Sequence, residues 1–366
     1  MKRHMLCAML GLALAAGSGA APAGTTLRAS HQFPGGQGDP RDEMVQLIVR
    51  EVEAANVGLK IQVFPGSSLY KAKEQWGALT RGQLDMTAFP LDYASGRVPQ
   101  FSATLMPGLV RNYEHAQRLN QSNFMKDIKA LVEKQGAVVI ADAWLAGGFA
   151  SKKHCITSPD TIKGQVIRAA GPAFEQMLAA AGASISSMPS SEVYSAMQTG
   201  VLDAANTSND SFVSYRLYEQ AKCLTAPGDN ALWFMYEPVL MSKKVFDGLE
   251  SRQREAILAA AKKAEAYFFE EAKKGEQKMR DVYTKAGVEV VTMTPEDYQA
   301  WMAVAKHSSY RLFAEKVKGG RRTAEEGAGR PVAPVRGRRP PRAVPAWPIR
   351  GGRLFSPPCA THREVA

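Results

Sequence analysis

The sequence contains few cysteines, no long apolar segment beyond its first residues, and none of the common catalytic motifs. Four cysteines in 366 residues exclude a small fold stapled by disulfides. No G-x-S-x-G, H-E-x-x-H, C-x-x-C or phosphate-loop pattern is present, so the enzyme classes that those motifs mark have no support. The six histidines are scattered without metal-ligand spacing, and the sequence therefore predicts no metal and no cofactor.

The first 23 residues have the three parts of a secretory signal peptide. Lys2 and Arg3 give a basic start, residues 5–16 are apolar, and small residues follow up to Ala23. The apolar run is too short for a stable membrane anchor. We therefore expect residues 1–23 to direct the chain to the periplasm, which is an oxidising compartment.

The composition of the remaining chain is that of a globular protein with an unusual end. Hydrophobic residues make up 45% and charged residues 22%, and the length suffices for two domains. The formal net charge is +11, but residues 319–366 contain ten arginines, no lysine and only three glutamates. The globular part is thus nearly neutral, which argues against a nucleic-acid partner.

Residues 319–366 also contain eight prolines and seven glycines, a composition that cannot bury a core. We expect this segment to be a disordered basic tail. One interpretation is an arm that binds nucleic acid or anionic lipid. The alternative, favoured by the abrupt Arg/Pro/Gly bias, is a non-functional extension typical of out-of-frame translation of GC-rich DNA, in which Cys359 has no role.

The most informative stretch is residues 162–203, which predicts a strand, a helix, a second strand and a second helix. Arg168 ends the strand that starts at Val166, and Pro172 opens the helix that follows. Ligands of open α/β sheets bind outside the carboxyl ends of strands, and a guanidinium suits a planar carboxylate. Arg168 is therefore the leading ligand-binding candidate. The alternative is a strand-end arginine paired with a surface acid.

Two sequence runs in this stretch carry a family resemblance. IKGQVIRA followed by MPSSEVYSAMQTGVLDAAN, with FPGSSLYKAKEQW earlier in the chain, resembles the periplasmic solute-binding proteins of tripartite ATP-independent periplasmic (TRAP) transporters, the DctP family. The resemblance covers about residues 25–317. It implies an α/β fold of two lobes with mixed sheets, hinge strands that cross between the lobes, and one long helix shared by both.

The resemblance also implies that each lobe is discontinuous in sequence. The first lobe is expected at about 24–145 and 236–275, and the second at about 146–235 and 276–318. Ser251 is expected to cap the long helix, which should end near Gly287.

Further ligand contacts are implied only by the resemblance. Asn206 and Thr207 fall where family members place polar or aromatic contacts, although both also suit a turn after a strand. Sialic-acid-binding members carry a second arginine where Gly148 stands here, so a smaller or less acidic ligand is expected. Four aromatic residues could line the cleft, although core packing is the usual role of any one aromatic: Trp144, Trp233, Tyr70 and Phe89.

Cys155 and Cys223 are the two cysteines of the globular part. In an oxidising compartment such a pair favours a disulfide, although two buried thiols are the alternative.

Together, the residues and the resemblance predict a receptor and not an enzyme. We expect a small organic acid, such as a monocarboxylate or a hydroxy- or oxo-acid, to be bound between the lobes and delivered to a TRAP membrane permease. The alternative is a secreted enzyme that acts on a carboxylate substrate on a similar two-lobed scaffold.

Overall fold

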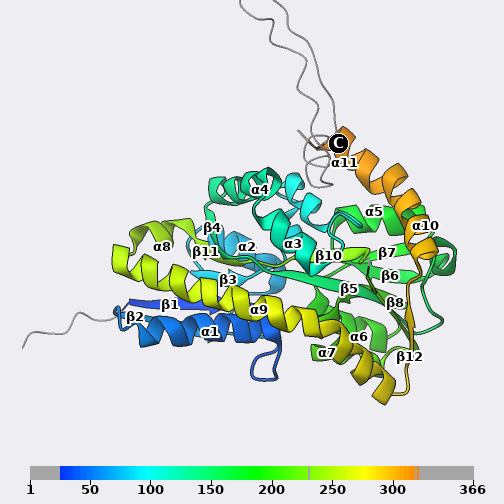
Figure 1. The fold of residues 1–366 in the computed structure, drawn as a ribbon, viewed down its shortest axis with the longest axis horizontal. Helices are drawn as coiled ribbons and strands as arrows, with labels where there is room; N and C mark the ends of the chain where they lie inside the picture. Colours follow the sequence, from blue (N-terminus) through cyan, green and yellow to red (C-terminus); the bar gives the residue numbers. More distant parts are fainter. Residues whose placement is uncertain (1–24, 230, 318–319, 321–366) are drawn as a thin grey trace, which may run out of the picture. The chain divides into compact units, whose positions relative to one another are not determined.

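The structure is a computed structural model that describes residues 25–229, 231–317 and 320. The expected signal peptide and, apart from Gly320, the expected basic tail lie outside the described residues. The described chain forms two sheets with helices around them (Figure 1).

The first sheet has five strands in the spatial order β2-β1-β3-β11-β4. Its strands are β1 (Thr25–Ser30), β2 (Leu59–Phe64), β3 (Met86–Ala88), β4 (Ala137–Ala141) and β11 (Val239–Ser242). β1 runs parallel to β2 and β3, whereas β11 is antiparallel to β3 and β4. We call this sheet, together with the helices that lie between β1 and β4 in the sequence, the first lobe.

The second sheet has seven strands, six of them in the order β12-β9-β5-β8-β6-β7, with β10 also paired to β5. Its strands are β5 (Trp144–Ser151), β6 (Val166–Ala169), β7 (Ser184–Ser187), β8 (Ala204–Ser208), β9 (Cys223–Ala226), β10 (Trp233–Tyr236) and β12 (Glu289–Thr292). β5 is antiparallel to its three neighbours, whereas β6 is parallel to β7 and β8. This sheet, together with the helices that lie between β5 and β9 in the sequence, forms the second lobe.

The chain crosses between the sheets three times. It crosses after β4, after β10, and through the long helix α9 (Ser251–Lys285) that joins β11 to β12. These crossings confirm the predicted fold class of two lobes with mixed sheets, crossing strands and one shared helix. The predicted lobe boundaries stay predictions.

Helices and short 3₁₀ helices (η) surround both sheets. The first lobe contains α1 (Pro40–Ala54), α2 (Ala72–Thr80), η1 (Leu91–Ala94), η2 (Pro99–Leu105), α3 (Tyr113–Asn120) and α4 (Asn123–Lys134). The second lobe contains η3 (Pro159–Ile162), α5 (Pro172–Ala180), η4 (Ser190–Glu192), α6 (Val193–Gln198), α7 (Asn209–Ser214) and η5 (Leu217–Glu219). The remaining helices are α8 (Lys243–Gly248), which follows β11, and α10 (Pro295–Ala305), a π-helical turn (Lys306–Tyr310) and α11 (Arg311–Lys316).

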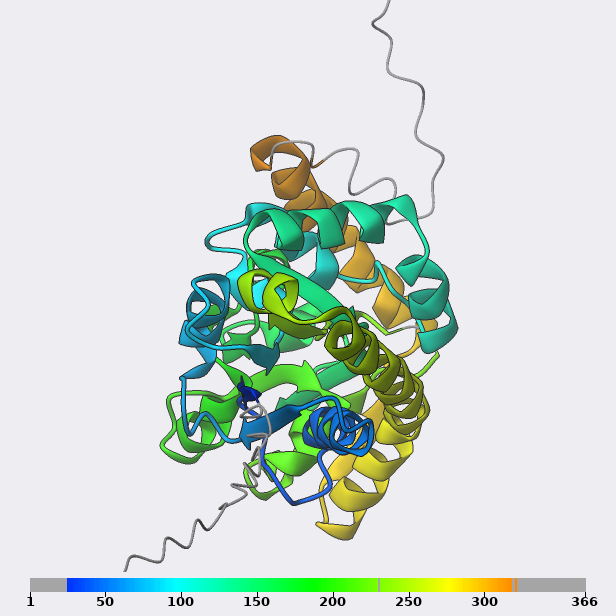
Figure 2. The same cartoon turned by 90° about the vertical axis from the view of Figure 1, so that its left-hand side faces the viewer.

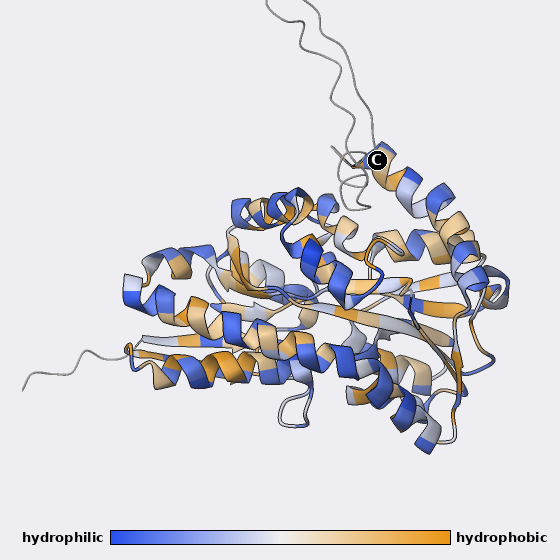
Figure 3. Ribbon diagram, viewed as in Figure 1, coloured by the Kyte–Doolittle hydropathy of each residue, from blue (hydrophilic) through white to orange (hydrophobic). Residues whose placement is uncertain are grey.

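The long helix α9 packs along α1 and holds the two lobes together. A helix of 35 residues is about 50 Å long, enough to reach from the first lobe to the second. Its buried residues Ile257, Ala261 and Phe268 join the core cluster that contains Met44 and Ile48 of α1. Figures 1 and 2 place the two helices side by side, and Figure 3 shows hydrophobic and hydrophilic residues alternating around them.

The start of α9 differs from the prediction by one residue. Glu250, not Ser251, is the N-cap, because its side chain and that of Gln253 form a reciprocal capping box. Ser251 is the first residue of the helix. No helix in the described part of the chain combines the length and the apolar character that a membrane span requires.

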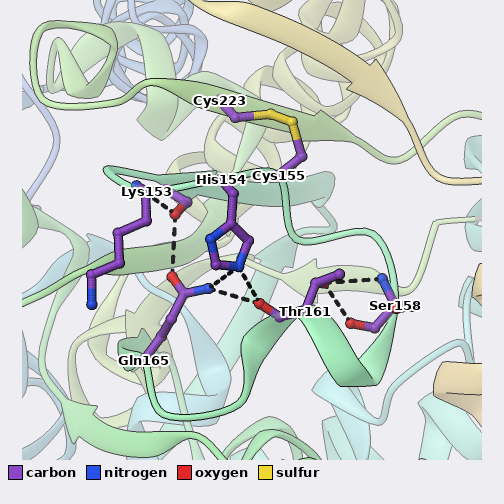
Figure 4. Close-up of a disulfide and its surroundings, with 8 residues drawn as sticks. Lys153, His154, Cys155, Ser158, Thr161, Gln165 and Cys223 are labelled. Atoms are coloured by element: carbon purple, nitrogen blue, oxygen red, sulfur yellow. Dashed lines mark hydrogen bonds between the residues drawn. A yellow bond between two sulfur atoms is a disulfide. The ribbon is translucent and has the colours of Figure 1, made fainter.

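Cys155 and Cys223 form a disulfide, which confirms the predicted pair. The bond joins the loop after β5 to the first residue of β9, across 68 residues of sequence. In the same loop, the Gln165 side chain donates to the carbonyl oxygen of Thr161 and accepts from the hydroxyl of Ser151 (Figure 4). The disulfide therefore attaches a hydrogen-bonded loop to the start of β9.

Candidate functional site

Arg168 lies inside the second lobe at the boundary with the first. Strand β6 carries it between β7 and β8, where it pairs with Ser186 on one side and Ala205 on the other. Its side chain is only 1% exposed. A guanidinium this deeply buried needs acceptors for its N–H groups, because an unpaired buried charge is costly.

Three acceptors hold the guanidinium of Arg168. Its Nε donates to the Met188 carbonyl oxygen (2.9 Å), Nη1 to the Asn206 carbonyl oxygen (2.7 Å), and Nη2 to the Tyr93 hydroxyl (2.9 Å). A guanidinium has five N–H donors. One N–H on each terminal nitrogen therefore has no acceptor among the described residues. Two donors on two nitrogens are what a carboxylate needs for a paired contact.

Tyr93 brings the first lobe to this arginine. It lies in η1, after strand β3, and its hydroxyl also accepts a hydrogen bond from the Ser190 backbone N–H (3.0 Å). Phe89, four residues earlier in the chain, was predicted as a cleft residue, but Tyr93 was not. Tyr93 and Arg168 are 75 residues apart in the sequence, so no local sequence pattern indicates their contact.

Asn206 and Thr207 lie next to the guanidinium on β8. The Asn206 carbonyl accepts from Arg168, and its side-chain Nδ2 donates to the Gly148 carbonyl oxygen (2.8 Å). Its Oδ1 is buried and has no hydrogen-bond partner within the described chain. Thr207 is buried and pairs with Gly148 across the strands. The structure thus brings Arg168 and Asn206 together, with Thr207 in the next position.

Gly148 stands at the position where a second arginine was considered. A Cβ built on this residue would overlap the backbone oxygen of Thr225. Any side chain here therefore requires β5 or β9 to shift. The packing of the sheet itself excludes a second arginine at this position in the present conformation.

Two of the four predicted aromatic residues lie close to these strands and loops. Phe89 is buried between Trp76 and Tyr93, with ring centroids 5.9 and 6.1 Å away, so it supports the ring of Tyr93. Trp233 lies on β10 opposite Gly147, and a Cβ built on Gly147 would overlap its indole ring. The Nε1 of Trp233 is buried, and no acceptor for it exists in the described residues.

The other two predicted aromatics are engaged elsewhere. The indole Nε1 of Trp144 donates to the Asn120 side chain (2.8 Å), and Trp144 lines a cavity of about 340 Å³ between α3 and α9. Arg168 is not among the residues that line this cavity. Tyr70 is partly buried on the first lobe, and its hydroxyl donates to the Gln83 carbonyl oxygen (3.4 Å).

A second buried arginine, Arg41 at the start of α1, was not predicted. Its five N–H donors reach the two oxygens of Asp39 and three serine hydroxyls: Ser208, Ser211 and Ser214. Glu237 lies 3.6 Å from its Nη1. Burial lowers the pKa of Arg41, but Asp39 and then Glu237 raise it well above its ordinary value. Because the serines belong to the second lobe, Arg41 ties α1 of the first lobe to it.

Three buried carboxyl groups near the two arginines hold protons more tightly than usual. Burial, the largest cause in each case, raises the pKa of Asp92, Asp210 and Glu237 to about 7. Asp92 belongs to η1 and its Oδ2 occupies the space that a Cβ on Gly171 would need, at the start of α5. The lobes therefore meet at a carboxyl group as well as at Tyr93.

Among the described residues, one close group of metal-ligating side chains is found, made of Cys155, Cys223 and Glu289. Both cysteines are bonded to each other, so their sulfurs are not thiolate ligands.

Comparisons with known proteins assign this architecture to a family. Residues 36–316 match the family model of bacterial extracellular solute-binding protein family 7, DctP. A solute-binding protein of Albidiferax ferrireducens is 40% identical over 299 residues, which cover 81% of this chain and 88% of that protein.

Solved structures agree with this assignment. A TRAP periplasmic solute-binding protein from Rhodoferax ferrireducens, crystallised with bound malonate, is 38% identical with a TM-score of 0.81, covering 83% of this chain and 97% of that one. One from Sulfurospirillum deleyianum with bound succinate is 25% identical, with a TM-score of 0.74 over 82% of this chain and 97% of that one. The chain therefore belongs to the DctP family, the extracytoplasmic solute-binding receptors of TRAP transporters.

Proposed function

We propose that this protein is a periplasmic receptor that binds a small organic acid through Arg168 and delivers it to a TRAP membrane permease. The observation that carries the proposal is the buried guanidinium with one free N–H on each terminal nitrogen. The described residues supply three acceptors for its five N–H donors. A ligand carboxylate supplies the missing acceptors and the missing negative charge.

The proposed ligand is about the size of malonate. The related receptor from Rhodoferax ferrireducens, which is 38% identical, was crystallised with that acid. Gly148 supports a small ligand, because no second arginine fits there to hold a distant acidic group. We propose a monocarboxylate, a short dicarboxylate, or a small hydroxy- or oxo-acid.

In the proposal, nearby polar groups that lack hydrogen-bond partners among the described residues give selectivity among such acids. The buried Asn206 Oδ1 accepts a hydrogen bond, and the Trp233 Nε1 donates one, so a ligand hydroxyl or keto group has suitable partners. In the proposal Thr207 adds a hydroxyl, and Phe89 excludes water behind Tyr93. Trp144 and Tyr70 have partners elsewhere, so the proposal gives them no ligand contact.

The fold supports capture and release. Tyr93 and Arg41 in the first lobe bond to groups in the second, so the structure has its lobes in contact. The two crossing strands and α9 are the connections about which the lobes would open. We propose that residues 1–23 export the chain as a signal peptide, and that the protein binds its ligand without chemical turnover.

Binding assays on purified protein test this proposal. Thermal-shift screening and calorimetry with malonate, succinate, lactate and pyruvate are expected to show binding of at least one acid. Arg168→Ala is expected to weaken that binding by at least about 30-fold while the protein stays folded, because a charge-assisted contact is lost. Arg311→Ala, an exposed arginine in α11 whose side chain is 55% accessible, is the matched control and should bind normally.

Two results would contradict the proposal. One is unchanged affinity in the Arg168→Ala variant. The other is stabilisation only by uncharged sugars or by cations. NMR of the acid after prolonged incubation separates a receptor from an enzyme, because a receptor returns its ligand unchanged.

A further inference from the structure

Tyr93 is the residue of the first lobe that reaches the binding guanidinium. Its ring stands edge-on to Phe89, with centroids 6.1 Å apart, which fixes where the hydroxyl lies. The short helix η1 then directs that hydroxyl into the second lobe, to Arg168 and to the Ser190 backbone N–H. The contact therefore depends on both lobes.

The hydroxyl of Tyr93 only accepts hydrogen bonds in this structure. It accepts from Arg168 Nη2 at 2.9 Å, from Ser190 N at 3.0 Å and, more weakly, from Gln32 Nε2 at 3.5 Å. A phenol also carries one hydrogen to donate. None of the described residues accepts that hydrogen. The hydroxyl lies 2.9 Å from Nη2 of Arg168, whose guanidinium also has N–H donors without acceptors among the described residues.

We propose that Tyr93 is the ligand-gripping residue of the first lobe, and that its O–H donates to the same carboxylate that Arg168 binds. This inference rests on the proposed function and adds the partner that the first lobe contributes. A carboxylate has two oxygens with about four acceptor positions, so it accepts from the two free N–H groups of Arg168 and from one O–H together. Tyr93 is thus both a ligand contact and the support of Arg168.

The arrangement makes closure depend on the charge of the ligand. Arg168 belongs to the second lobe and Tyr93 to the first, so a bound carboxylate joins the lobes through one group of atoms. An alcohol or an amide cannot accept from three donors at one point in this way. Acids should therefore stabilise the closed form, and a neutral analogue of the same size should not.

The test compares two tyrosine hydroxyls that both bridge the lobes. Tyr93→Phe removes the proposed ligand contact and keeps the ring on Phe89. Tyr215→Phe is the matched control, because the Tyr215 hydroxyl donates to the Gln32 carbonyl oxygen across the same boundary at 3.0 Å. Each variant is measured without ligand and with malonate, by thermal melting and by calorimetry, and circular dichroism checks the fold.

Without ligand, both variants are expected to melt at similar temperatures slightly below wild type. With malonate, Tyr93→Phe should bind about 10- to 100-fold more weakly and lose most of the ligand-induced shift. Tyr215→Phe should bind within about threefold of wild type and keep the shift.

The inference is overturned if Tyr93→Phe binds malonate as wild type does, or if Tyr215→Phe loses the same affinity. Either result leaves the proposed function intact, provided that the wild-type protein binds the acid and Arg168→Ala does not. If the wild-type protein binds none of the acids in the panel, the proposed function fails, and the role of Tyr93 fails with it.

Discussion

Arg41 and Arg168 are both buried at the boundary between the lobes, but they differ in the number of hydrogen-bond acceptors and in ion pairing. Arg41 has five N–H donors and five acceptors, all supplied by the chain. Arg168 has three acceptors for the same five donors. Asp39 and Glu237 balance the charge of Arg41 at 2.7 and 3.6 Å, whereas the described chain forms no ion pair with Arg168.

The comparison separates an arginine with a structural role from one that is available to bind a ligand, as proposed for Arg168. A fully satisfied, paired guanidinium stabilises the fold and has nothing left for a ligand. A partly satisfied one keeps both hydrogen-bonding capacity and charge for something that arrives later. Residue type and burial are the same at the two sites, so the number of acceptors is the distinguishing quantity.

The largest expected effect is the loss of Arg41. Arg41→Ala leaves Asp39 and Glu237 buried without their cation and should lower the free energy of unfolding by about 4 kcal/mol. Urea denaturation monitored by circular dichroism measures this. Arg311→Ala, which loses an exposed ion pair, should change the same quantity by less than about 1 kcal/mol. A stable Arg41→Ala protein would remove the distinction drawn here.

A Cβ at Gly148 is expected to have the next largest effect. Gly148→Ala should lower the free energy of unfolding by about 3 kcal/mol, because the new carbon overlaps the Thr225 backbone oxygen. Gly96→Ala is the control, since no atom lies near its Cβ position. If Gly148→Ala unfolds at the wild-type urea concentration, the sheet tolerates a side chain there, and the argument for a small ligand weakens.

Lysine at each of the two positions sharpens the comparison. Lysine keeps the charge but not the planar fork of five donors. Arg41→Lys should lower the free energy of unfolding by about 2 kcal/mol with affinity for malonate preserved. Arg168→Lys should weaken malonate binding about 30-fold, which is also about 2 kcal/mol, with little change in unfolding. Calorimetry and urea denaturation on both variants are needed. Effects of the same kind in both would show that the two arginines are equivalent.

The remaining expected effect is a dependence of the free energy of unfolding on pH. Burial raises the pKa of each of three carboxyl groups, Asp92, Asp210 and Glu237, to about 7. Asp92 interacts with the charges of Glu175 and Arg168. The folded protein keeps these protons up to about pH 7, whereas the unfolded chain loses them near pH 4. The free energy of unfolding should therefore fall as pH rises from about 4 to 7, because the unfolded chain loses these protons first.

Asp92→Asn isolates the contribution on the Arg168 side. The variant should equal wild type near pH 4 and be more stable at pH 8, because it has no proton to lose. Thermal melting across this pH range measures the difference. Equal slopes in the two proteins would show that Asp92 ionises normally in the folded state.

Local sequence patterns predicted much of this protein. The pattern of residues 162–203 predicted β6, α5, β7 and α6, and Ser251 and Gly287 marked the ends of α9 to within two residues, since each pattern acts within one element. The strand that contains Arg168 was also predicted, although it ends one residue later at Ala169, and the pair Cys155–Cys223 was predicted correctly. Motif resemblance named the family, because its runs of residues are contiguous.

Only the tertiary structure decided which side chains meet. Tyr93 reaches Arg168 across 75 residues, and Arg41 reaches three serines at the end of β8 and in α7 across 167 to 173 residues. Trp144, which shares a strand with Gly148, bonds to α3 instead of joining the arginine. Contacts of this kind depend on how two lobes pack, and no periodicity along the chain records them. The sequence by itself determined the elements and singled out Arg168 as the candidate ligand-binding residue. The packing of the lobes determined how many of the N–H donors of Arg168 have no acceptor among the described residues.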